Sequence, residues 1–138
     1  MELAELFREA QRAALAAYAP YSNFRVGAAL LGADGRVYTG CNVENRSYGL
    51  TICAERSALA SAVSQGQRAF AALAIATPDS ADPVGPCGAC RQVLSEFMGP
   101  EAAVYFCGRR GDPVITTMGA LLPYDSLHDL HKGAAAIP

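Results

Sequence analysis

The N-terminal segment has the hydrophobic pattern of an amphipathic helix. Its apolar positions recur every three or four residues, at Leu3, Leu6, Phe7, Ala10, Ala14 and Tyr18, and that spacing places them on one face of an α-helix. Pro20 follows, and proline cannot continue a helix because it lacks the backbone N–H. The pattern therefore predicts a covering helix that stops before Pro20.

Two β-prone segments come next. Residues 26–31 and 37–43 are largely apolar, and a turn sequence rich in Gly and Asp separates them. This arrangement predicts an antiparallel hairpin. A polar loop at residues 45–49 precedes a second helix, expected to start at Ile52 or Cys53 and to stop at Gly66.

The second half of the chain alternates strands with helices. Residues 70–76 are apolar at every position, as expected of a central strand that helices cover on both faces. A loop at 78–86, a helix from Cys87 to Met98, strands at 103–107 and 114–117 and a short helix at 119–122 complete the prediction. Interleaved strands and helices around a buried strand predict an α/β fold with a mixed sheet between helical layers.

Size and charge exclude several classes of protein. The 138 residues fit a single domain, 1–138, and no apolar run reaches the roughly 18 residues needed to span a bilayer. The charged N-terminus does not resemble a targeting segment, so we expect a cytoplasmic protein without a membrane partner. With 11 basic against 13 acidic residues, no nucleic-acid partner is expected either, because such proteins neutralise phosphates.

Two short motifs carry the chemistry. Cys53-Ala54-Glu55 and Pro86-Cys87-Gly88-Ala89-Cys90 offer three thiolates, Cys53, Cys87 and Cys90, to one Zn²⁺ ion. Closed structural zinc sites use four protein ligands, whereas catalytic sites use three and leave one position for water. Glu55 is not needed as a ligand and is placed to carry protons for that water.

The predicted helices support this interpretation. Cys53 and Cys87 each open a helix, where the positive end of the dipole favours a thiolate, and Cys90 shares a helical face with Cys87. Arg56 is predicted to donate hydrogen bonds to the ligand sulfurs and to offset their charge. The alternative is a closed structural zinc site with Cys107, His128 or His131 as the fourth ligand.

Four ordered motifs together resemble a known family. With residues 24–29 (FRVGAA) and 40–45 (GCNVEN), the two cysteine motifs are similar to those of the small homotetrameric zinc-dependent cytidine deaminases, over about residues 18–123. The resemblance implies an α/β/α three-layer sandwich with a mixed five-stranded sheet. It also implies hydrolysis of cytidine and deoxycytidine to uridine and deoxyuridine, one zinc per chain, and a homotetramer with shared active sites.

The resemblance further implies roles for residues that bind the nucleoside. Asn42 and Glu44 would hold the ribose 3′-hydroxyl, Phe24 would pack on the pyrimidine, and the backbone at Ala54 would face the base. One departure from the family pattern is Ser126, which stands where the family usually has a Phe that reaches a neighbouring subunit's site. Arg46 is another, since the family usually has a small residue there.

Other functions are compatible with parts of the pattern. A blasticidin-type deaminase shares the Cys-Ala-Glu element and acts on a nucleoside antibiotic. A polynucleotide deaminase is disfavoured by the charge and by Cys53 as first ligand. In a zinc-stabilised binding module without catalysis, Glu55 would have no functional role.

Overall fold

The structure is a computed structural model that describes residues 1–125 and residue 127. Its elements are, in chain order, α1 (Leu3–Ala14), β1 (Gly27–Gly32), β2 (Val37–Cys41), the 3₁₀ turn η1 (Tyr48–Leu50), α2 (Ala54–Ser64), β3 (Phe70–Ala76), α3 (Gly88–Ser95), β4 (Met98–Cys107), β5 (Val114–Thr117) and α4 (Met118–Leu121). None of the helices in this part of the chain is long and apolar enough to cross a membrane.

The five strands form one mixed sheet in the order β2-β1-β3-β4-β5. The β3–β4 pair is parallel, and the other three pairs are antiparallel. The hairpin predicted for the first two strands and the central place predicted for residues 70–76 are both confirmed.

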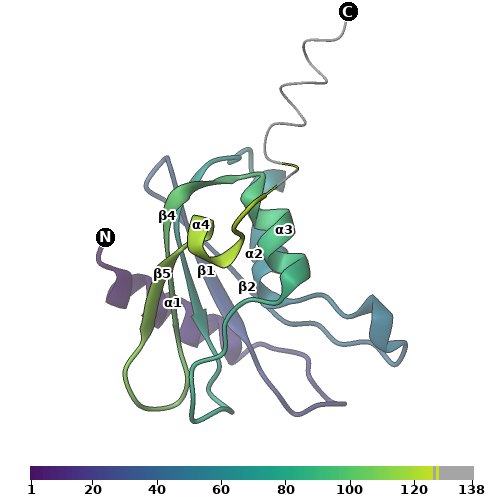
Figure 1. Cartoon of the computed structure of the whole chain (residues 1–138). Helices are drawn as coiled ribbons and strands as arrows, with labels where there is room; N and C mark the ends of the chain where they lie inside the picture. The colour runs from purple at the N-terminus through teal and green to yellow at the C-terminus, as the bar shows by residue number, and fades with distance from the viewer. Residues whose placement is uncertain (126, 128–138) are drawn as a thin grey trace, which may run out of the picture.

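Helices cover both faces of this sheet, as Figure 1 shows with α1 behind it and with α3 and α4 in front. On one face, Leu6 and Ala10 of α1 pack on alternate alanines of the sheet, among them Ala29 and Ala74. On the other face, α2, α3 and α4 cover a larger core of Leu, Ile, Val and aromatic side chains. The three-layer α/β/α architecture is therefore confirmed.

Two glycines allow these layers to approach closely. A Cβ atom on Gly27 of β1 would lie 1.9 Å from the carbonyl oxygen of Ala10, and one on Gly40 of β2 would lie 2.3 Å from the backbone nitrogen of Ala58. Any side chain at either position would push a helix off the sheet.

The first helix ends earlier than predicted. It stops at Ala14 rather than near Tyr18, because Tyr18 pairs with the chain beyond β2. Its N–H donates to the carbonyl of Asn42 at 3.0 Å, and its carbonyl accepts from the N–H of Glu44 at 2.8 Å. Residues 42–44 accordingly lie beyond the end of β2, which was predicted to extend to Val43.

The boundary between the third helix and the fourth strand was also predicted wrongly. The helix ends at Ser95 rather than Met98, and the strand starts at Met98 rather than Ala103. Met98 is buried and pairs with Phe70, and a shift in register between Phe70 and Ala72 keeps the following Gly and Pro in the strand. Tertiary pairing here overrides the strong local signal of Gly99-Pro100 for a turn.

Candidate active site

Three cysteine thiols converge where two helices begin. Cys53 is the N-terminal cap of α2, Cys87 is the cap of α3, and Cys90 lies in the first turn of α3. The Sγ atoms of Cys53 and Cys87 are 3.9 Å apart, and those of Cys87 and Cys90 are 3.5 Å apart. All three sulfurs lie within 4.8 Å of one another, so the structure brings together the three cysteines that the motifs single out.

This geometry fits zinc. Sulfur ligands at about 2.3 Å from a tetrahedral zinc lie about 3.8 Å from one another, close to the two separations observed. Hydrogen bonding within the cluster, first from Cys90 and then from Arg56, lowers the pKa of Cys53 to about 5. The same contact raises the pKa of Cys90, so Cys53 is the thiolate of this pair, and the thiolate is the form that a metal requires.

Glu55 lies beside the thiols and is buried. It occupies the first turn of α2 and is only 4 % exposed. Burial, and then the charge of Cys53, raise the pKa of this carboxyl above its ordinary value. A buried carboxyl with a raised pKa holds a proton more readily than an exposed one, which suits a general acid–base group.

Arg56 contacts the cluster from the same helical turn. Its Nη2 donates to Sγ of Cys53 at 3.3 Å, which is the contact expected from the sequence. Its Nε–H is buried and has no hydrogen-bond partner among the described residues. The contact from Nη2 thus places the positive charge of the guanidinium next to the thiol of Cys53.

A cavity of about 170 Å³ opens onto this cluster. Its lining includes Asn42, Cys53, Ala54, Glu55 and Cys87. The cavity thus joins two of the three thiols and the carboxyl to one of the residues predicted to bind ribose. Phe24 and Glu44 do not line it.

Asn42 and Glu44 both hold the backbone of residues 21–26, but at different places. The amide of Asn42, 6 % exposed, accepts from the N–H of Val26 and donates to the carbonyl of Phe24, both at 2.8 Å. Glu44 accepts from the backbone N–H groups of Tyr21 and Ser22 and from the Ser22 hydroxyl. The Ser22 hydroxyl, followed by these backbone donors, lowers the pKa of Glu44, so Glu44 is a carboxylate at neutral pH.

Sequence reasoning missed several residues of the cavity. Thr51, Thr77, Val84 and Gly85 also line it. Thr77 directly follows the apolar run of β3, and polar residues at the carboxyl end of a strand are a recognisable site signal. The other three lie in loops whose paths no local pattern predicts.

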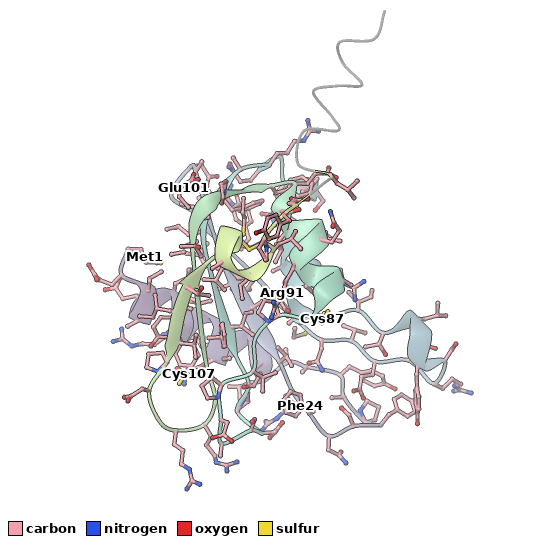
Figure 2. All side chains as sticks on the ribbon, in the orientation of Figure 1. Met1, Phe24, Cys87, Arg91, Glu101 and Cys107 are labelled. Carbon is pink, nitrogen blue, oxygen red and sulfur yellow. The ribbon has the colours of Figure 1, made fainter. Side chains whose placement is uncertain are left out.

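Arg91 was also missed as a structural link. Its Nε donates to the carbonyl of Pro86 at 2.8 Å, and its Nη1 donates to the carbonyl of Leu121 at 3.0 Å. It thereby connects the turn that precedes Cys87 to the end of α4. Figure 2 shows Arg91 next to Cys87.

The alternative interpretation, a closed structural zinc site, gains no fourth ligand from the described residues. Among them, the only group of metal-binding side chains is Cys53, Cys87 and Cys90. Cys107 is buried at the end of β4 and its thiol faces the carbonyl of Gly111 at 3.7 Å. His128, His131 and Ser126 lie outside the described residues.

Comparison with known proteins gives a consistent picture. Residues 1–107 match the family described as the cytidine and deoxycytidylate deaminase zinc-binding region. A cytidine deaminase from Sporosarcina psychrophila is 50 % identical over 123 residues, which cover 89 % of this chain and 90 % of the relative. One from Halalkalibacterium halodurans is 50 % identical over 123 residues, 89 % of this chain and 92 % of its own.

Solved structures agree with the sequence relatives. The crystal structure of cytidine deaminase from Burkholderia pseudomallei superimposes with a TM-score of 0.85 at 50 % identity, over 90 % of this chain and 98 % of that one. The cytidine deaminase of Mycobacterium tuberculosis gives a TM-score of 0.77 at 43 % identity, over 90 % and 96 % of the two chains. The similarity thus extends over nearly the whole fold.

Proposed function

We propose that this chain, which belongs to the zinc-binding family of cytidine and deoxycytidylate deaminases, hydrolyses cytidine and deoxycytidine to uridine and deoxyuridine and releases ammonia. The observation that carries the proposal is the buried carboxyl of Glu55 beside three thiols at zinc-binding spacing. A cavity reaches both groups, so a small substrate can meet them. A closed structural metal site would need neither the cavity nor the carboxyl.

Cys53, Cys87 and Cys90 would hold the zinc. When bound, zinc supplies Lewis-acid activation of water. Three thiolates are strongly electron-donating, and the N-termini of α2 and α3 and the guanidinium of Arg56 would offset their charge.

Glu55 would move the protons. In the first half of the reaction it accepts a proton from the attacking water and delivers it to N3 of cytosine, which makes C4 electrophilic. The water oxygen then forms its bond to C4. In the second half Glu55 transfers the remaining proton of that oxygen to the amino group, the C4–N bond breaks, and ammonia leaves as the C4 carbonyl forms.

The nucleoside would be held by four further residues. Asn42 lines the cavity and still has one donor and one acceptor position after its two backbone contacts. Glu44 retains an acceptor position beside its three contacts, so both side chains are available to the ribose 3′-hydroxyl. Phe24 would pack on the pyrimidine, and the backbone at Ala54 would face the base.

We further propose that the protein is a homotetramer with shared active sites. The segment between β2 and α2 extends away from the rest of the molecule on the right of Figure 1. It exposes Tyr48 by 74 %, Leu50 by 68 % and Ile52 by 46 %. Apolar side chains gathered on a protruding segment are typical of a subunit interface.

We assign residues 1–138 to one catalytic domain and place its reaction in the cytoplasm. No disulfide joins any of the five cysteines, all of which lie in the described part of the chain, and a reducing compartment keeps cysteines in that state.

An ammonia-release assay tests the proposed function. The purified zinc-loaded protein is incubated separately with cytidine, deoxycytidine and blasticidin S, and loss of the cytosine absorbance is followed in parallel. Release of ammonia from both nucleosides is the expected result. Activity on blasticidin S alone would identify an antibiotic deaminase, and no release from any substrate would favour a non-catalytic zinc protein.

A further inference from the structure

Asp79 makes an unusually complete set of contacts with a single residue. It lies in the loop after β3, and its Oδ2 accepts from the backbone N–H and from Nε of Arg25, both at 2.9 Å. Its Oδ1 accepts from Nη2 of Arg25 at 2.8 Å. The carboxylate therefore binds both the side chain and the main chain of Arg25, although the two residues are 54 positions apart.

Arg25 belongs to a segment, residues 21–26, that we call the strap. The strap lies outside every helix and strand, and Asn23 within it adopts a left-handed backbone with φ of 57°, which asparagine tolerates better than most residues. Its backbone makes two hydrogen bonds with other backbone groups, from the N–H of Asn23 to the carbonyl of Ala19 and from the N–H of Asn42 to the carbonyl of Val26. The N–H groups of Tyr21, Ser22, Arg25 and Val26 are bound by side chains from elsewhere instead.

Three side chains supply that support. Glu44 holds the beginning of the strap through the N–H groups of Tyr21 and Ser22. Asn42 holds its end through the carbonyl of Phe24 and the N–H of Val26. Asp79 holds the N–H of Arg25, which lies between those two contacts.

The strap and the loop that bears Asp79 both border the cavity. Val26 of the strap lines it, and so do Thr77 and Gly85, which flank Asp79 along the chain. In Figure 2, Phe24 lies below Cys87. Asp79 thus joins two chain segments that both contribute residues to the cavity wall.

We propose that Asp79 is a positioning residue for substrate binding, because it holds the strap, with Phe24 and Val26, against the loop after β3. The inference rests on the proposed function, since the strap matters only if the cavity receives a nucleoside. Asp79 does not reach the thiols or Glu55, so it acts on substrate affinity rather than on the chemical step. A residue that only stabilised the fold would not change substrate affinity while leaving the rate of the chemical step unaltered.

Three variants separate the contacts of Asp79. Arg25→Gln and Asp79→Asn each remove the ion pair and leave an acceptor for the N–H of Arg25, whereas Asp79→Ala removes every contact. Asp82→Asn is the matched control, because Asp82 is an exposed carboxylate of the same loop. All four are compared with the wild-type holoenzyme at one pH.

Steady-state kinetics on cytidine give the first measurement. We expect Asp79→Ala to raise KM about tenfold, because a charge-assisted hydrogen bond to the backbone is lost with the ion pair. The ion-pair variants should raise KM about threefold, since a partly exposed pair contributes little. The kcat of all variants should stay within about twofold of wild type, and the dissociation constant of the product uridine, measured by calorimetry, should rise in step with KM.

Hydrogen exchange gives a second measurement that does not depend on activity. Peptides covering residues 21–26 should exchange faster in Asp79→Ala than in wild type or Asp82→Asn, while peptides from β3 should not change. The inference would be overturned if hydrogen exchange in the strap were unchanged in Asp79→Ala. It would also be overturned if kcat fell while KM and the dissociation constant of uridine stayed the same. If wild type releases no ammonia from cytidine, the proposed function fails, and the exchange and uridine measurements still decide the role of Asp79.

Discussion

The guanidinium of Arg56 lies 3.3 Å from the thiol of Cys53, measured between Nη2 and Sγ. Two residues of one helical turn thus place a fixed positive charge beside a proposed zinc ligand. The contact with Cys53, and then that with Cys90, raise the pKa of Arg56 above its ordinary value, so it stays charged at every accessible pH. Three thiolates around a bound Zn²⁺ would leave a net charge of −1, which would weaken the acidification of water, and we propose that Arg56 counters that effect.

Replacing Arg56 with Gln should therefore reduce turnover. The substitution keeps a hydrogen-bond donor near Cys53 but removes the charge, so the activated water becomes less acidic. Each unit of pKa rise corresponds to about 1.4 kcal/mol, and a one-unit rise would shift the acidic limb of the pH–rate profile upward by about one unit. Arg68→Gln, at an exposed position just beyond α2, is the control. A rise in KM alone would instead place Arg56 in the substrate pocket.

Glu55→Gln should abolish most activity and keep the zinc. The amide fills the same buried space but cannot carry protons, and general acid–base catalysis contributes about 10²- to 10⁴-fold. Metal content by atomic absorption should remain one zinc per chain. Glu96→Gln, at an exposed position beyond α3, should behave as wild type. Near-normal kcat in Glu55→Gln would refute the proton-carrier role.

Cys87→Ala should lose zinc and stability together. Two remaining thiols cannot complete the coordination set, and metal binding that requires the folded state contributes to folding free energy. The measurements are zinc released to a chromogenic chelator and the thermal midpoint. Cys41→Ala removes a thiol outside the cluster and should keep one zinc per chain. A full zinc complement in Cys87→Ala would mean that the ligands are assigned wrongly.

Much of this site was predictable because its chemistry is concentrated in short motifs. Cys53, Glu55, Cys87 and Cys90 need only two helix starts to converge, and the uniformly apolar run at 70–76 predicted the central strand. The Asp79–Arg25 contact was not predictable in the same way, because it joins two irregular segments whose paths depend on the whole fold. The end of α1 was mispredicted for a similar reason, since pairing of Tyr18 with residues 42–44 is a tertiary effect.

Whether the ribose 3′-hydroxyl is free or bonded to a phosphate should decide which substrates react. Glu44 is a carboxylate whose pKa is lowered by Ser22, so it accepts a hydrogen bond from a free hydroxyl but repels a phosphate. Cytidine should be deaminated, whereas cytosine within single-stranded DNA or RNA should not. Uracil formation is measured by mass spectrometry of the digested oligonucleotide. Its appearance at a rate comparable to that with cytidine would overturn the ribose-site assignment.

The Asp79–Arg25 pair should also make the stability of the fold depend on pH in the acidic range. Hydrogen bonds from the side chain and then the backbone of Arg25 lower the pKa of Asp79 to about 2, from an ordinary 3.8. A carboxyl with a lowered pKa in the folded state stabilises the fold above its ordinary pKa, and that contribution disappears as the pH falls toward the lowered value. The urea midpoint of wild type should thus exceed that of Asp79→Asn at pH 6, and the difference should shrink between about pH 4 and pH 2. Asp82→Asn, measured in parallel, should show no such trend. A difference between wild type and Asp79→Asn that is the same at pH 6 and pH 2.5 would mean that the charge of Asp79 contributes nothing, and that the variant acts through packing alone.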